Sequence, residues 1–307
     1  MVKGYVVSVE RRKEEEPSKE EEPKALERFP FGIEKLDEAI EGGVPVGSWV
    51  VISGMPGTGK TVLTQHATYS ALKNDYRVVY VSIEQKFWEW LTQAKLLGLN
   101  VDSYPIVKLD NILSFDSKTK KFVLDFDKAP ENFRVAFIDI YSLVSVARYV
   151  GVQKREEGRR KWYSYLDVEV LSTASDLAFR LFAENPEEKR LKFRHKILFV
   201  VDSLSVFYLR APSMAGKVAL DLSLRFKRNN VVGLLTTHYA QTTSATFGFR
   251  VEHVADGILH LWMDNVEATK EVKRYLIIKK MRMTQHSLKA FKVFIEKGKG
   301  MRVEPLE

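Results

Sequence analysis

Apolar runs of strand length alternate along this chain with stretches that have helical spacing. The strand-like runs cover 49–53, 77–83, 133–140, 196–201, 231–236 and 257–262. The helical patterns cover 61–73, 86–97 and 168–183. Strands that are apolar on both faces and separated by helices form parallel sheets with helices on each side. The pattern therefore predicts an α/β fold with a mostly parallel central sheet covered by helices on both faces.

The segment before this pattern is different in kind. Residues 10–28 mix acidic and basic side chains, contain two prolines and include one large apolar residue. Such a composition buries too little apolar surface to offset the conformational entropy lost on ordering. We expect residues 1–28 to form an N-terminal segment with a flexible charged tether, and residues 29–307 to form one domain.

Two stretches interrupt the alternation of strands and helices. Residues 108–127 have apolar clusters on either side of a polar run, which predicts a hairpin. Residues 149–165 are rich in Lys and Arg and indicate a basic mobile loop. We expect both stretches to be insertions in the domain.

Composition narrows the chemistry. The 307 residues include no cysteine, which excludes disulfides, Cys-ligated zinc, iron–sulfur clusters and thiol nucleophiles. The formal net charge is +8, and residues 271–307, with 10 basic and 4 acidic side chains, supply +6 of it. This basic end fits nucleic acid, a bound polyphosphate or a solvated surface. Without a long apolar run or a secretion signal, we expect no membrane span and a cytoplasmic protein.

One motif specifies a phosphate-binding loop. It fits the pattern G-x-x-x-x-G-K-[S/T] in full, with Gly54, Met55, Pro56, Gly57, Thr58, Gly59, Lys60 and Thr61. The motif lies between an expected strand and an expected helix, where backbone N–H groups can cradle the phosphates of a nucleotide. We expect Lys60 to neutralise the β- and γ-phosphates and the Thr61 hydroxyl to bind Mg²⁺.

Further polar residues end the neighbouring strands. Asp139 and Asp202 each follow an apolar run, and either fits the carboxylate that holds the metal. The run before Asp202 is longer, although an Asp there also suits a helix cap. We expect Glu84 to activate the attacking water, the alternative being a glutamate favoured by the helix dipole. We expect Thr237 to contact the γ-phosphate, the alternative being a structural threonine.

Together these motifs resemble the KaiC-like ATPases of the RecA/RadA superfamily, particularly archaeal proteins with a single KaiC domain. The resemblance covers about residues 29–305, and its blocks are 31–37, 42–45, 54–61, 81–85, 200–203, 251–258 and 280–286. It implies a RecA-like core and a hexameric ring that binds ATP between subunits. It also implies that Asp202, not Asp139, is the metal ligand.

The same resemblance assigns residues to the subunit interface. It implies that Lys280 and Arg282 reach the γ-phosphate bound by a neighbouring subunit, and that His286 lies near the nucleotide. Two positions depart from the family pattern: Gln85 replaces a second glutamate, and Met283 replaces a glycine. The loss of one carboxylate favours slow hydrolysis.

Three functions remain open at this point. The first is a Mg²⁺-dependent ATPase that acts as an oligomeric regulatory switch. The second is a protein of the RadA-paralog type that binds single-stranded DNA through residues 239–250, where Phe247 and Phe249 stack on bases and Arg250 pairs with phosphate. Packing of these aromatics at a subunit interface is the alternative. The third is a scaffold that binds ATP without hydrolysing it.

Overall fold

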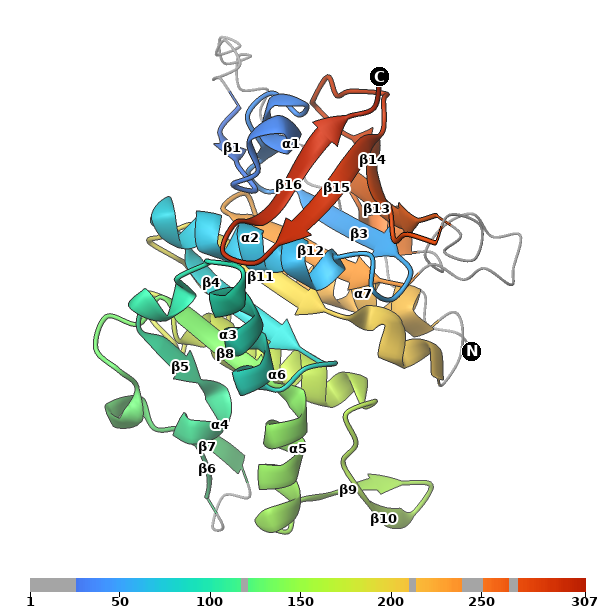
Figure 1. Cartoon of the computed structure of the whole chain (residues 1–307). Helices are drawn as coiled ribbons and strands as arrows, with labels where there is room; N and C mark the ends of the chain where they lie inside the picture. The colour runs from blue at the N-terminus through green and yellow to red at the C-terminus, as the bar shows by residue number, and fades with distance from the viewer. Residues whose placement is uncertain (1–25, 117–120, 210–213, 239–250, 265–269) are drawn as a thin grey trace, which may run out of the picture.

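The computed structural model describes residues 26–116, 121–209, 214–238, 251–264 and 270–307. Its central element is a ten-stranded sheet. Its strand order is β16-β15-β14-β13-β3-β12-β11-β4-β8-β5 (Figure 1). The strands from β13 to β5 pair in parallel, whereas β14, β15 and β16 pair antiparallel at one end. The predicted α/β fold with a mostly parallel sheet is confirmed.

The elements follow the apolar runs closely. The strands of the main sheet are β3 (Trp49–Gly54), β4 (Arg77–Ser82), β5 (Ile106–Lys108), β8 (Val135–Asp139), β11 (Ile197–Asp202), β12 (Val231–Thr237), β13 (Gly257–Met263), β14 (Arg274–Met281), β15 (Phe291–Glu296) and β16 (Gly300–Pro305). The small two-stranded sheets pair β1 (Arg28–Phe29) with β2 (Val44–Pro45), β6 (Leu113–Asp116) with β7 (Lys121–Leu124), and β9 (Gln153–Glu156) with β10 (Arg159–Trp162). The α-helices are α1 (Glu34–Glu38), α2 (Lys60–Lys73), α3 (Phe87–Leu96), α4 (Leu109–Ile112), α5 (Ile140–Tyr149), α6 (Val168–Arg180) and α7 (Met214–Phe226).

Two apolar clusters fill the space between the sheet and its helices. Along β3, Val50 and Ile52 belong to one cluster, while Trp49 and Val51 belong to the other. The first cluster contains residues of α1, α2 and α3, and the second contains residues of α5, α6 and α7. Burial on both faces explains why each central strand is an uninterrupted apolar run.

The parallel pairing gathers the carboxyl ends of the central strands at one edge. Asp202 is in register with Ser82, which is in register with Asp139, and Thr237 is in register with Ser53. The loops that follow these strands therefore share this edge, which we call the carboxyl edge. Open α/β sheets bind their ligands there.

The antiparallel strands at the C-terminal end were not predicted as part of the main sheet. They extend the sheet beyond β13 and also contact α2, where the backbone N–H of Met301 donates to His66 Nε2 at 2.6 Å. Burial lowers the pKa of His66 to about 4, so the neutral ring accepts this hydrogen bond. This contact fixes the last strands against the helix that begins at the phosphate-binding loop.

Both stretches that interrupt the sequence pattern contain antiparallel pairs. The β6–β7 pair lies within 108–127. Within 149–165 the chain forms the β9–β10 ribbon, where the sequence indicates a loop. Figure 1 shows this ribbon beside the lower end of α5, at the margin of the molecule. In the described ranges, no helix combines the length and apolar composition needed to cross a membrane.

Candidate nucleotide-binding site

The loop between β3 and α2 has a backbone that glycines make possible. Gly59, which caps α2, has φ +105°, in the left-handed region that favours glycine. At Gly54 an added Cβ would lie 2.4 Å from the carbonyl oxygen of Leu261, so any larger side chain would displace β13. The loop thus turns tightly into α2, and the helix's first N–H groups face the loop as an anion-binding terminus.

Lys60 is held inside this loop. Its Nζ donates to the carbonyl oxygens of Gly54 at 2.9 Å and Met55 at 2.8 Å, and the residue is 6% exposed. Burial lowers the pKa of Lys60 to about 8, although the charges of Asp202 and Glu84 oppose the shift. A buried cation beside helix N–H groups fits a polyphosphate.

Asp202 occupies the carboxyl edge beside the loop. Oδ1 accepts from Thr236 Oγ1 at 2.6 Å, and Oδ2 accepts from the hydroxyl of Tyr80 at 3.1 Å. Burial raises the pKa of Asp202, while hydrogen bonds from Thr236 and Thr61 oppose this. The Tyr80 oxygen also lies 3.0 Å from Thr64 Oγ1, so a polar network orients the carboxylate toward α2.

Asp139, the other aspartate considered from the sequence, has a different environment. It accepts from the backbone N–H of Ser142 at 3.1 Å, and so caps α5. It also accepts from the Ser142 hydroxyl at 2.9 Å and from the backbone N–H of Phe87 at 3.2 Å. These bonds tie two helices to β8, whereas Asp202 lines the cleft described below.

Glu84 and His238 face each other across the opening of the site. Glu84 Oε1 lies 3.7 Å from His238 Nε2, and the Glu84 side chain is 39% exposed. Burial, reinforced by the charge of Lys60, lowers the pKa of His238 to about 4. Gln85 lies at the same opening, and its Oε1 is buried without a hydrogen-bond partner among the described residues. Thr237 is fully buried, so His238 is the residue after β12 that lines the site.

These residues surround a cleft of about 380 Å³ at the carboxyl edge. Its lining comprises Pro56, Gly57, Gly59, Lys60, Thr61, Val62, Glu84, Gln85, Gln93, Asp202, His238, Arg274 and Ile295. The sequence did not predict Gln93, Arg274 and Ile295 at this site; they come from α3, β14 and β15. Arg274 Nε donates to the Gly57 carbonyl oxygen at 3.0 Å, which supports the loop. No motif marks these three residues, because only the sheet topology brings them to the loop.

The oxygen atoms beside the loop fit Mg²⁺. The hydroxyl of Thr61 and the carboxylate of Asp202 are hard oxygen donors of the kind that Mg²⁺ prefers, and both line the cleft. The described residues contain no cluster of three or more acidic or histidine ligands. Magnesium at nucleotide sites commonly uses few protein ligands, with phosphates and water completing its shell.

The residues expected at the subunit interface lie away from this chain's own cleft. Lys280 Nζ donates to the Ala255 carbonyl oxygen at 2.6 Å, and Arg282 Nη1 lies 3.3 Å from Asp256 Oδ1. Lys280 lies near the end of β14 and Arg282 just past it, roughly 20 Å or more along the strand from Arg274. His286 follows them, with Nδ1 3.1 Å from the Ser287 carbonyl oxygen. A single chain therefore does not bring them to the nucleotide loop.

Two other regions bear on the site. The segment proposed to face DNA, with Phe247, Phe249 and Arg250, lies outside the described residues.

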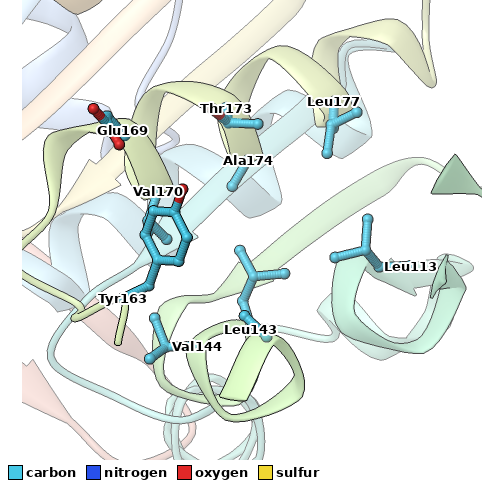
Figure 2. A pocket seen from close by; sticks show the side chains of 10 residues that line it. Leu113, Leu143, Val144, Tyr163, Glu169, Val170, Thr173, Ala174 and Leu177 are labelled. Carbon is cyan, nitrogen blue, oxygen red and sulfur yellow. The ribbon is translucent and has the colours of Figure 1, made fainter. Parts of the chain in front are cut away.

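A separate pocket of about 250 Å³ lies between α5 and α6, with Leu143, Ala174 and Leu177 among its aliphatic walls (Figure 2). Among its described lining residues the charged one is Glu169, and none is a cation that could hold a phosphate. We therefore assign the nucleotide to the first cleft.

ATP affinity is expected to decrease above about pH 8. The protonated amine of Lys60 attracts phosphate and the neutral amine does not, so the Kd rises as the pH passes the lowered pKa of about 8. The rise is at most about tenfold per pH unit, since one proton is involved. Calorimetric titration with ATP between about pH 6.5 and 9.5 measures it. A Kd that stays constant over this range would contradict the assignment of Lys60.

The sheet, the loop and the neighbouring aspartate define a P-loop nucleotide-binding protein with a RecA-like fold. The model of the KaiC ATPase family matches residues 29–145 and 187–307, so the chain belongs to this family. A UPF0273 protein of Thermotoga maritima is 27% identical over 282 residues, which are 92% of this chain and 98% of that protein. A UPF0273 protein of Methanopyrus kandleri is 27% identical over 283 residues, 92% and 93% of the two chains. The crystal structure of a KaiC-like protein from Pyrococcus horikoshii has a similar fold, with a TM-score of 0.57, 22% identity and coverage of 92% and 100%.

Proposed function

We propose that this protein is a Mg²⁺-dependent ATPase that hydrolyses ATP in the cleft at the carboxyl edge. The observation that supports this most strongly is the convergence of Lys60, Asp202 and Glu84 on the phosphate-binding loop. The three residues come from different elements. Phosphoryl transfer requires a cation for the phosphates, a carboxylate for the metal and a base for the nucleophile, and Lys60, Asp202 and Glu84 fit these needs in that order.

Each residue has a distinct role in this proposal. The loop N–H groups and Lys60 bind the phosphates, and Thr61 with Asp202 holds Mg²⁺, which neutralises phosphate charge when bound. Glu84 accepts a proton from the attacking water. Since Gln85 is not a base, Glu84 acts without a second carboxylate beside it, and turnover is slow.

The position of Lys280 and Arg282 supports an oligomer. They lie at the opposite end of β14 from the cleft, so a head-to-tail contact would bring the Arg282 edge of one subunit to the cleft of the next. Repeating this heterologous contact with closure makes a ring, which we propose is hexameric. Slow hydrolysis in such a ring suits a regulatory switch whose state depends on the bound nucleotide.

Phosphate release tests the proposal. The protein is expected to release phosphate slowly from ATP when Mg²⁺ is present. This release is expected to stop when EDTA removes the metal. Lys60→Ala is expected to weaken ATP binding by at least about tenfold, because a charged hydrogen-bonding group contributes about 1.5–3 kcal/mol. Lys73→Ala, at the exposed opposite end of α2, is the matched control. Unchanged ATP affinity in Lys60→Ala, or release that does not depend on Mg²⁺, would contradict the proposal.

A further inference from the structure

The β9–β10 ribbon stands apart from the ATPase core. It lies beside the lower end of α5, at the margin of the molecule (Figure 1), and within residues 146–186, which the KaiC family model does not match. Arg148 attaches its base, because Nε and Nη2 donate to the Tyr163 carbonyl oxygen at 3.3 and 3.2 Å. The ribbon thus lies outside the part of the chain that the family model matches, and the nucleotide site does not explain it.

The ribbon concentrates positive charge. Residues 148–163 contain six basic and two acidic side chains, a net charge of +4 out of the chain's +8. Arg155, Arg159 and Arg160 are exposed, and within the described part of the chain they form no hydrogen bond or ion pair. These cations are therefore available to an external anion.

The pairing of the two ribbon strands places like charges opposite each other, which does not stabilise the ribbon. Arg155 lies directly opposite Arg160, and like charges in this position destabilise an antiparallel pair. Trp162 lies two residues beyond Arg160 in the same strand, so both project from the same face. The Trp162 side chain is 48% exposed. One face of the ribbon thus combines two guanidinium groups with an accessible indole.

We propose that this face binds single-stranded nucleic acid. Arg155 and Arg160 pair with successive phosphates, and a base stacks on Trp162. An accessible indole favours a single strand over a duplex, whose bases are already stacked, and over an acidic peptide, which offers no bases. The proposal does not depend on ATP hydrolysis and does not involve the segment 239–250.

Binding of a fluorescein-labelled oligothymidylate of about 20 nucleotides, followed by anisotropy, tests the proposal. The double variant Arg155→Glu with Arg160→Glu is expected to bind at least about tenfold more weakly at low salt. Its slope of log K against log salt is expected to be shallower by about 1.4, because each lost phosphate contact removes about 0.7. The control, Lys189→Glu with Arg190→Glu, makes the same charge change on exposed residues before β11 and is expected to retain most of the affinity.

Base stacking has its own test. Trp162→Ala is expected to weaken oligothymidylate binding by at least about fivefold, the lower limit for loss of one stacked base. The unaltered protein is expected to bind an abasic oligonucleotide of equal length at least about fivefold more weakly than oligothymidylate. The Trp162→Ala variant is expected to bind the two oligonucleotides with equal affinity.

Four results would overturn the proposal. They are no oligonucleotide binding, unchanged binding in the ribbon variants, an equal loss in the control variant, and polyglutamate binding as tight as oligothymidylate. The last result would assign the ribbon to an acidic protein partner. Circular dichroism and ATP binding of each variant establish that the fold is intact.

Discussion

Replacing Glu84 by Gln is expected to lower ATP turnover by about 10²- to 10⁴-fold while leaving ATP affinity nearly unchanged. Glu84 and Asp202 supply the carboxylates that line the cleft. Asp202 is buried and hydrogen bonded to Thr236 and Tyr80, so it is poorly placed to accept a proton from water. Glu84 is partly exposed at the opening and is the better base.

The competing base is His238, which lies 3.7 Å from Glu84. Burial and the charge of Lys60 lower the pKa of His238 to about 4, so its imidazole is neutral at pH 7 but only a weak base. Single-turnover hydrolysis and a separate measurement of the ATP Kd distinguish chemistry from binding. Glu131→Gln, an exposed residue in the loop before β8, is the matched control. If the Glu84→Gln variant retains turnover, a residue other than Glu84 is the general base.

Replacing Arg282 by Ala is expected to lower turnover by about 10³- to 10⁵-fold, the range found for arginine fingers. The side chain of Arg282 is 59% exposed, and its ion pair with Asp256 contributes little to folding. Asp256 retains Lys227 Nζ at 2.6 Å and the backbone N–H of Trp49 at 2.9 Å when Arg282 is removed. The loss is therefore expected in catalysis and not in stability.

Thermal unfolding and phosphate release on the same preparation separate these effects. Arg302→Ala, an exposed arginine of β16 that pairs with Glu296 and Glu304, is the control and is expected to keep turnover within about threefold. A large fall in the melting temperature of Arg282→Ala would assign Arg282 a structural role. Normal turnover in a variant that still assembles would contradict a role at the γ-phosphate.

The central part of the fold was predictable because each parallel strand is buried on both faces, and its sequence is therefore a run of apolar residues. The phosphate loop was predictable because its backbone needs glycines at fixed spacing. The last three strands were not predicted, since β14 and β15 alternate buried and partly exposed residues among many lysines and arginines. Arg274 was missed for the same reason, because it reaches Gly57 only through the pairing of β14 with β13.

Other site features needed atomic contacts. Asp139 and Asp202 end similar strands, and without the family resemblance only their hydrogen bonds distinguish a helix cap from a cleft residue. Met283 has φ +55°, in the left-handed region where a glycine is favourable, at the position where the family pattern has glycine. The sequence indicates a loop where the ribbon lies, because its two strands consist mostly of charged residues and contain no β-branched residue, the type that favours strands.

Mixing Glu84→Gln subunits with Arg282→Ala subunits tests most directly whether the site is shared between subunits. In an equal mixture, about a quarter of the interfaces join an intact Glu84 cleft to an intact Arg282 edge. Phosphate release from this mixture is therefore expected to reach about a quarter of the unaltered rate, although each variant alone is inactive. An inactive mixture, with both variants shown to assemble together, would contradict a nucleotide site completed by the neighbouring subunit.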